Sequence, residues 1–285
     1  MKPHKNLIKS VRKSLSIILT FSLSHFLTFS LSYGAFDEFS ASPRVLSMGG
    51  ASIALSDDAS AVNSNPAGLI QIETTEVMAS YSDLYNTDGL SRGHIAVAIP
   101  SGANALGFSF NRLSLKGIYD EDVLSAAFSR QLSNHLAVGL AVRILSDEIH
   151  DAGLNFYKGR KYSGTYSVGM IHQAADNWLF AITGENLNEP AIAAGEKNSA
   201  VWKGGVRFHP FETGLMVLDY NVNSNDLAVG FEVIIGDVLP LRLGFRNQKP
   251  TFGFGIRHNF LNFDFAILSD TNLGLQTQAG MRIRI

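Results

Sequence analysis

Hydrophobic and polar residues alternate with a period of two from Thr75 to the end of the chain. Such a period is typical of β-strands whose two faces meet different surroundings. Punctuating Gly, Pro, Asn and Asp residues divide the alternation into short segments, which predict 14 strands. The segments are centred on residues 77–81, 95–99, 106–110, 124–128, 136–144, 162–170, 178–182, 202–208, 216–220, 227–235, 241–245, 252–256, 261–267 and 275–285.

The two faces of these strands differ in chemistry. One face is apolar and aromatic along nearly every strand, whereas the other carries Gly, Ser, Thr and charged residues. Only 17% of the chain is charged, against about 25% in a typical soluble domain. Apolar residues outside and polar residues inside are the pattern of a membrane barrel. We therefore predict an all-β fold, a transmembrane antiparallel β-barrel of about 14 strands over residues 75–285, with a soluble β-protein as the alternative.

The connections between the strands favour the barrel. An even number of strands puts both termini on one side of the membrane, the periplasmic side in bacteria. Two connections on the opposite side are long, at residues 146–160 and 185–198. Tight connections on the side of the termini are predicted at residues 100–102, 131–133, 210–211 and 236–237.

The polar face carries charges that a barrel would turn toward its lumen. Since an unpaired buried charge is costly, we expect these groups to pair across the lumen or with the N-terminal segment. Such pairs would brace the barrel, and a polar substrate path is the alternative. The predicted lumenal charges are Arg143, Lys203, Arg207, Glu232, Arg242, Arg246, Asp264, Arg282 and Arg284.

Residues 1–34 have the layout of an export signal. Five basic residues precede an apolar run at residues 15–31, and small residues, Ser32 and Gly34, stand before Ala35. This layout predicts a cleaved secretory signal peptide. The alternative is an uncleaved anchor helix, but Ser, Thr and His residues interrupt the run, which suits a span of about 20 apolar residues poorly.

Composition excludes several classes of protein. Removal of residues 1–34 leaves 23 − 5 = 18 basic residues against 25 acidic ones, so the net charge moves from −2 to −7. An acidic chain without a basic cluster is a poor nucleic-acid binder. The chain has no cysteine, which excludes disulfides and thiol chemistry. No later apolar run reaches 18 residues, so no transmembrane helix is expected.

Residues 35–74 do not alternate and form the second predicted unit, an N-terminal hatch or plug. Gly49 and Gly50 indicate a turn, and Asp57 or Asp58 is expected to cap a short helix. Asn65 precedes a proline, which favours an extended Asn65 followed by a turn. A periplasmic leader is the alternative, but the segment carries apolar residues suited to packing inside a barrel. These are Val45, Leu46, Met48, Ile53, Leu55, Val62, Leu69 and Ile70.

Residues 43–69 resemble the N-terminal segment of the FadL-like outer-membrane protein superfamily, whose hatch carries an Asn-Pro-Ala motif. The resemblance rests on three short stretches and is greatest to the PorV/PorQ branch. The stretches are Met48–Ala51, Asp57–Ala61 and Asn65–Leu69. It implies a 14-stranded barrel plugged by this segment. The residues implied for the hatch are Gly49, Gly50, Asp57, Asp58, Asn65, Pro66 and Ala67.

The resemblance implies a protein of the bacterial outer membrane that passes or binds small hydrophobic molecules through a hatch-gated lumen. Outer-membrane lipid, the barrel assembly machinery and hydrophobic small molecules or secretion-system proteins are the implied partners. A non-transporting PorV/PorQ-like barrel, acting in protein secretion or surface attachment, is the alternative. Two departures from the family are Ser64 before the motif and Ile285 in place of a terminal aromatic residue.

Candidate chemistry is sparse. Asp147, Glu148, His150 and Asp151 cluster in one long connection, where oxygen and imidazole ligands could hold a divalent ion. A solvated surface loop is the favoured interpretation, because no further ligand is near in the sequence. The chain has no His-Glu-x-x-His motif, phosphate loop or Gly-x-Ser-x-Gly motif. We therefore expect no catalytic residue, metal or cofactor, and a barrel hydrolase is a distant third hypothesis.

Overall fold

The computed structural model describes residue 36 and residues 42–150, 159–192, 197–247 and 249–285, all in one compact unit. The expected signal peptide, residues 1–34, lies outside the described residues, as does part of the expected hatch. No helix in the described part of the chain combines the length and the apolar character needed to cross a bilayer.

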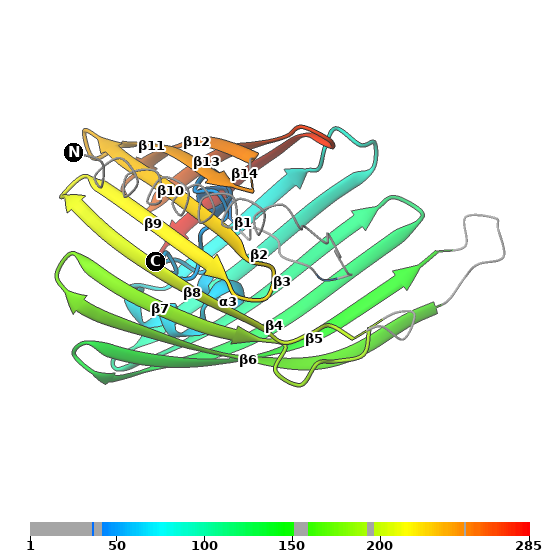
Figure 1. Ribbon diagram of the computed structural model, residues 1–285, viewed down its shortest axis with the longest axis horizontal. Helices are drawn as coiled ribbons and strands as arrows, with labels where there is room; N and C mark the ends of the chain where they lie inside the picture. Colours follow the sequence, from blue (N-terminus) through cyan, green and yellow to red (C-terminus); the bar gives the residue numbers. More distant parts are fainter. Residues whose placement is uncertain (1–35, 37–41, 151–158, 193–196, 248) are drawn as a thin grey trace, which may run out of the picture. The chain divides into compact units, whose positions relative to one another are not determined.

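The strands close into an antiparallel barrel, in which each strand pairs with its neighbours in sequence and β1 also pairs with β14 (Figure 1). The 14 strands are β1 (Glu76–Asp83), β2 (Leu90–Ser101), β3 (Asn104–Leu115), β4 (Tyr119–Ser133), β5 (Leu136–Ile149), β6 (Gly159–Ala175), β7 (Trp178–Glu185), β8 (Val201–Phe211), β9 (Gly214–Asn221), β10 (Asp226–Ile235), β11 (Leu239–Arg246), β12 (Lys249–His258), β13 (Leu261–Asp270) and β14 (Gly274–Arg284). This confirms the all-β fold and the strand number that the alternation predicts. Closure leaves no edge strand among the described strands, although Gly159–Ser167 of β6 extends past the end of β7.

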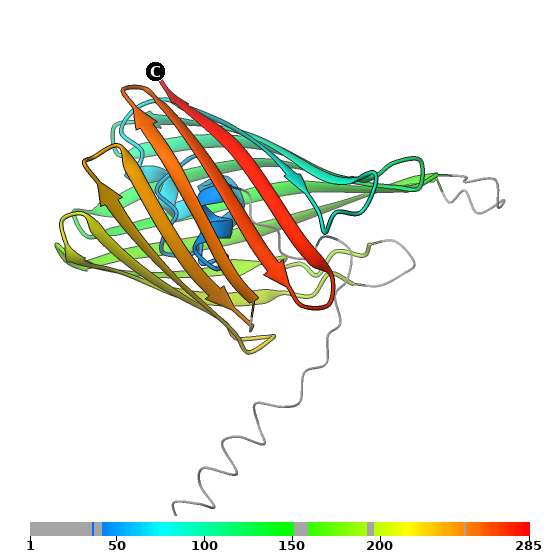
Figure 2. The ribbon, with the colours of Figure 1, turned by 90° about the horizontal axis from the view of Figure 1, so that it is seen from above.

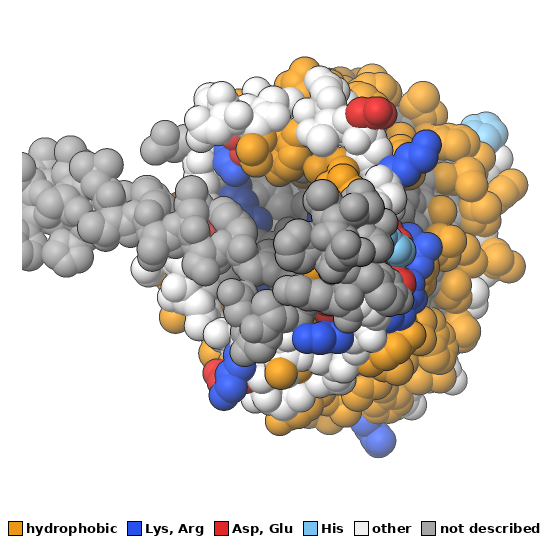
Figure 3. Space-filling model, turned by 90° about the vertical axis from the view of Figure 1, so that its right-hand side faces the viewer, with side chains coloured by type: hydrophobic (Ala, Val, Ile, Leu, Met, Phe, Trp, Pro, Cys, Tyr) orange, Lys and Arg blue, Asp and Glu red, His pale blue; other side chains and the backbone are white. Residues whose placement is uncertain are grey.

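The apolar face of the sheet points outward. On β1, Glu76 and Met78 are buried inside the barrel, whereas Tyr81 is 60% exposed on the outer wall. The same alternation on other strands leaves Phe108 and Leu243 exposed at 49% and 60%. Figure 3 shows apolar side chains covering much of the outer wall. A soluble β-protein buries its apolar face, so this arrangement does not fit the soluble alternative.

The two ends of the barrel differ in their connections. At the end where β14 terminates, which we call the short-turn end, the turns have two or three residues. They occupy residues 102–103, 134–135, 176–177, 212–213, 236–238 and 259–260. The opposite end, the long-loop end, carries the connections at residues 84–89, 150–158 and 186–200.

One predicted loop is shorter than expected. The sequence pattern predicts a connection over residues 146–160, but Ser146–Ile149 belongs to β5, and β6 begins at Gly159. The strands continue because charges pair across them: Arg160 Nη2 lies 2.6 Å from Glu148 Oε2. Such cross-strand pairs stabilise a sheet where apolar residues do not alternate, so the apolar pattern ends before the strands do.

Residues 42–72, which we call the inner segment, lie inside the barrel (Figure 2). This segment contains α2 (Pro43–Ser47), α3 (Ala61–Ser64) and the 3-10 helix η1 (Pro66–Gln71). Ser42 begins α2 by accepting a hydrogen bond from the Val45 N–H at 3.3 Å. The apolar side chains of the segment pack against alanines and small residues of the wall, and Met48, Val62 and Leu69 are fully buried.

Eight inward-facing glycines of the wall lie against the inner segment, and we call them the glycine ring. At each one an added Cβ would come within 3.0 Å of an atom of the inner segment. At Gly230, for example, it would lie 2.7 Å from Met48 Cβ, and at Gly280 it would lie 2.9 Å from Pro43 Cδ. The ring comprises Gly107, Gly139, Gly169, Gly205, Gly230, Gly244, Gly253 and Gly280. Close backbone approach, which only glycine permits, therefore seats the segment against the wall.

Candidate functional site

The Asn-Pro-Ala turn connects three parts of the molecule. Asn65 is extended, with φ −147° and ψ 103°, and Pro66 begins η1. Asn65 Oδ1 accepts a hydrogen bond from the Ala67 N–H at 3.2 Å. Asn65 Nδ2 donates to the carbonyl oxygens of Ile53 at 3.1 Å and Met170 at 3.4 Å. One buried side chain thus joins η1, the preceding loop of the inner segment and β6 of the wall.

The wall opposite this turn has almost no side chains. Gly139 and Gly169 face each other in register on β5 and β6. A Cβ on Gly139 would lie 2.8 Å from the Ala67 Cα. Ser129 Oγ donates to the Ala67 carbonyl oxygen at 3.0 Å. The turn therefore lies directly on the backbone of the wall.

Gly49 and Gly50 form the turn that follows α2, with φ of 71° and 81°. Gly49 N–H donates to Thr251 Oγ1 at 3.0 Å, and the same hydroxyl donates to the Ser47 carbonyl oxygen at 3.0 Å. A Cβ on Gly49 would lie 2.7 Å from the Phe245 backbone nitrogen. Both the left-handed backbone and the contact with the wall thus require glycine at position 49.

Of the two residues expected to cap a helix, Asp58 binds a backbone donor just before α3, whereas Asp57 pairs with arginines. Ser60 occupies the N-cap position of α3 without a side-chain cap hydrogen bond, and Asp58 Oδ1 accepts the Ser60 N–H at 3.0 Å. The Asp57 carboxylate lies between Arg44 and Arg207. Burial opposes the charge of Asp57, but these two guanidinium groups outweigh it and hold the pKa of Asp57 below its usual value.

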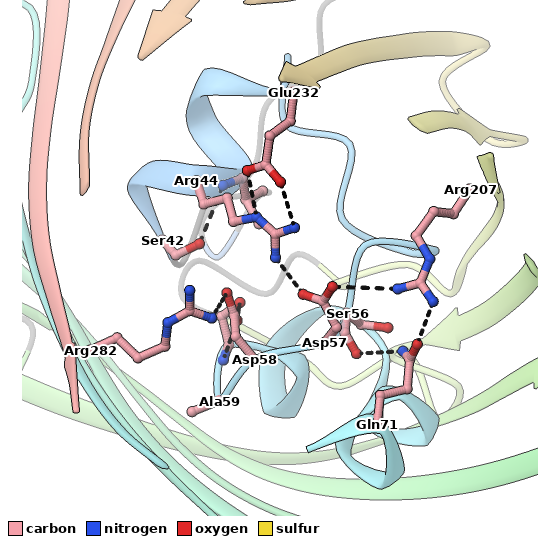
Figure 4. A network of polar contacts seen from close by, with 12 residues as sticks. Ser42, Arg44, Ser56, Asp57, Asp58, Ala59, Gln71, Arg207, Glu232 and Arg282 are labelled. Carbon is pink, nitrogen blue, oxygen red and sulfur yellow. Dashed lines mark hydrogen bonds and ion pairs between the residues drawn. The ribbon is translucent and has the colours of Figure 1, made fainter. Parts of the chain in front are cut away.

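Glu232 pairs with arginines of both the inner segment and the wall, and Figure 4 shows the part of this network that links Glu232 through Arg44 to Asp57 and Arg207. Arg44 approaches its carboxylate with Nε at 3.1 Å and Nη2 at 3.2 Å. Arg242 Nε lies 2.6 Å from the same carboxylate, and Arg242 Nη1 lies 2.5 Å from Asp264. Since these groups are buried, the network holds the inner segment in one position.

The other predicted lumenal charges also point into the barrel and contact carboxylates. Their partners lie on the adjacent strand, on the inner segment or, for Arg143, two strands away. The pairs are Arg143–Glu185, Lys203–Glu185, Arg207–Asp57, Arg246–Asp226, Arg282–Asp58, Arg282–Glu76 and Arg284–Glu76. The described lumen is therefore braced by charge pairs rather than lined with unpaired charges of one sign.

Sequence reasoning missed three residues that hold the inner segment. Arg44 is the only charged residue between positions 42 and 56, which is a usable signal. Glu76 accepts the Ala59 N–H at 2.7 Å. Asp219 of β9 accepts the N–H groups of Ser52 and Ile53 at 2.5 and 2.7 Å. Only contacts in space distinguish these two carboxylates from other inward-facing ones.

An apolar groove of about 550 Å³, the outer groove, crosses the outer wall over β14, β1 and β2. Small residues, Ala79, Gly93 and Ala279, form its floor between the bulky side chains of Tyr81 and Phe263. Three inward-facing residues, Ser80, His94 and Gly280, also line it, so the wall is thin at this place. Behind it, His94 Nε2 lies 3.1 Å from Nδ2 of Asn63 in the inner segment.

A second cavity, the polar pocket, has a volume of about 240 Å³ and lies between the inner segment and the wall at the short-turn end. Its charged lining suits ions and water rather than an apolar molecule. It is lined by Arg44, Asp57, His209, Glu212, Thr213, Gly214, Leu215, Glu232, Ile234, Arg257, Asn262, Arg282 and Arg284. Among the described residues, no group of three or more His, Asp or Glu side chains is placed to hold a metal ion. Of the four residues considered from the sequence, Asp147, Glu148 and His150 belong to no such group, and Asp151 lies outside the described residues.

Replacing Asn65 by alanine is expected to lower the free energy of unfolding by about 2 kcal/mol. The variant loses the cap of η1 and leaves the buried carbonyl oxygens of Ile53 and Met170 without this donor. Urea unfolding of the purified barrel in detergent measures the effect. Asn134→Ala, in an exposed turn, is the control. Equal unfolding midpoints for the two variants would contradict a bracing role for Asn65.

No family model matches the sequence, and no curated protein matches it. Among solved structures, the chain is similar to the monoaromatic hydrocarbon channel CymD, with a TM-score of 0.71 and 13% identity over 88% of this chain and 99% of that one. It is also similar to the toluene transporter TbuX of Ralstonia pickettii, with a TM-score of 0.67 and 11% identity over 88% and 100%. For the toluene transporter TodX of Pseudomonas putida, the TM-score is 0.62 and the identity 13% over 88% and 99%. The chain therefore has the fold of these hydrocarbon channels.

Proposed function

We propose that this chain is a FadL-like barrel of the bacterial outer membrane that binds or passes small hydrophobic molecules. Residues 1–34 would be the export signal, residues 35–74 the hatch and residues 75–285 the barrel. The short-turn end would face the periplasm and the long-loop end the exterior, as in other outer-membrane barrels. The observation that carries the proposal is the fold shared with channels for monoaromatic hydrocarbons and toluene.

The outer groove supports this proposal as the place where an apolar molecule binds. Its lining is mostly apolar, and its volume lies within the range of small-molecule sites. The groove also meets the inner segment through the contact between His94 and Asn63. A hatch that shifts at this contact would open the thin wall, so we place the route beside α3 rather than through the polar pocket.

Filling the outer groove is expected to remove most of the uptake that depends on this chain. Ala79→Phe places a ring on the floor of the groove, whereas Ala126→Phe places the same ring on the outer face of β4, away from the groove. The measurement is uptake of radiolabelled toluene by cells with and without the chain, at matched amounts of folded barrel. Equal uptake with and without the unaltered chain would overturn the proposed function.

If the Ala79→Phe and Ala126→Phe variants take up toluene equally well, the chain is still a channel, but its route does not pass through the outer groove. The solved channels named above favour transport over the PorV/PorQ-like role in secretion or surface attachment. If cells lacking the chain take up toluene normally but fail to display secreted proteins, that alternative replaces the present proposal. The same neighbours are channels rather than enzymes, which supports a non-enzymatic barrel.

A further inference from the structure

The polar pocket is built around guanidinium groups. Four arginines line it, Arg44 from the inner segment and three from the last strands of the barrel. Arg257 of β12 and Arg282 of β14 flank Asn262 of β13 in register, so two cations stand close together on one wall of the pocket. Glu212 and Thr213, from a turn of the short-turn end, and Gly214, the first residue of β9, also line the pocket.

The carboxylates in the pocket are already shared between cations. Glu232 contacts Arg44, Arg242 and Arg257, and Asp57 contacts Arg44 and Arg207. With Asp264, this connected group contains four guanidinium groups, Arg44, Arg207, Arg242 and Arg257, against three carboxylates, Asp57, Glu232 and Asp264. The group therefore has one positive charge in excess. Glu212 lines the mouth of the pocket but is exposed to solvent.

Three of the lining arginines, Arg257, Arg282 and Arg284, lie 3.4 Å or more from their carboxylates, and two of these three are also partly exposed. Arg257 Nη2 lies 3.5 Å from Glu232, and its side chain is 30% exposed. Arg284 Nε lies 3.4 Å from Glu76, and its side chain is 50% exposed. Strong guanidinium–carboxylate pairs lie at about 2.7–2.9 Å, so both groups keep N–H donors for another acceptor.

We propose that the polar pocket binds a small oxyanion, a carboxylate or a phosphate, between Arg257 and Arg284. The excess positive charge attracts an anion, and the forked guanidinium donors match the oxygens of these groups. About 240 Å³ holds several water molecules and so admits a phosphate or a short carboxylate. The source is either a free ion or the head group of an anionic phospholipid. Binding of this anion does not depend on passage of a hydrophobic molecule.

Titration calorimetry with inorganic phosphate on the purified full barrel, in nonionic detergent at constant ionic strength, tests the site. We expect saturable binding of one phosphate, weakened about tenfold or more in Arg257→Gln. Arg130→Gln, an exposed arginine that does not line the pocket, is the matched control and should bind as the unaltered chain does. Arg257→Lys keeps the charge without the fork and should bind with intermediate affinity.

Gel migration with and without heating establishes that each variant is folded, so a loss of binding is not a loss of the barrel. The same titration with acetate in place of phosphate tests whether the polar pocket binds a carboxylate. In nanodiscs of phosphatidylglycerol, weaker phosphate binding than in phosphatidylcholine would identify a phospholipid head group as the source, and equal binding a free ion. Absence of saturable phosphate and acetate binding, or equal affinity in Arg257→Gln and the unaltered chain, would overturn the proposal. A negative uptake experiment would leave it standing.

Discussion

Replacing Gly139 by valine is expected to lower the free energy of unfolding by about 3 kcal/mol or more, which makes it one of the most damaging single changes in the barrel. The new side chain would occupy the space taken by the backbone of Pro66 and Ala67, and backbone atoms yield less readily than the end of a flexible side chain. Urea unfolding of the barrel in detergent micelles, followed by tryptophan fluorescence, measures the change.

Gly164→Val provides the control for this experiment. Gly164 lies on the outer face of β6, and a Cβ there meets no atom within 4 Å. The residue exchange and the strand conformation are thus alike, whereas Gly164 lies on the outer face and has no contact with the inner segment. Equal destabilisation by both substitutions would mean that a β-branched residue is tolerated poorly anywhere in the wall, and that the glycine ring does not seat the inner segment.

Glu232→Gln is expected to cost about 3–5 kcal/mol, because removal of one partner leaves buried cations without compensation. The change withdraws a negative charge from Arg44, Arg242 and Arg257 together. Arg44 and Arg242 are nearly or fully buried, so water cannot replace the carboxylate. The urea midpoint of the folded barrel should fall accordingly, with Glu73→Gln, an exposed carboxylate, as the control.

A double variant shows whether Arg44 and Glu232 stabilise the barrel as a pair or only through the total charge of the lumen. When Arg44→Gln is combined with Glu232→Gln, the total loss should be smaller than the sum of the two single losses, because the second change removes one of the uncompensated cations. Additive losses would show that Arg44 and Glu232 act independently, and the network in Figure 4 would then not couple the inner segment to the wall.

The local signals were strong where the two faces of a strand meet unlike surroundings. Val77 and Tyr81 alternate with Glu76 and Met78, and the structure turns these pairs outward and inward as the pattern predicts. Near the long-loop end, where charged residues replace apolar ones, the alternation no longer marks the strands. Asp147 and Glu148 belong to β5 because Lys161 and Arg160 stand opposite them, and no pattern within a single segment reports its neighbour across the sheet.

The inner segment was predictable in composition but not in placement. Its apolar residues and its glycine turn are visible in the sequence, as is the extended Asn65 before Pro66. The cap at the start of α3 was predicted only in part, because Asp58 accepts the Ser60 N–H whereas Asp57 pairs with arginines elsewhere in the chain. Partners such as Arg207 become visible only after the barrel closes.

The sequence by itself determined the strands, their number, the apolar outer face and the polar inner face, since each depends on the alternation of neighbouring residues. Only the tertiary structure decided which of the inward glycines touch the inner segment, which carboxylate each guanidinium meets and where the wall is thin. Those features depend on residues far apart in the chain. Gly139 and Ala67, or Arg44 and Glu232, come together only when the sheet closes around the inner segment.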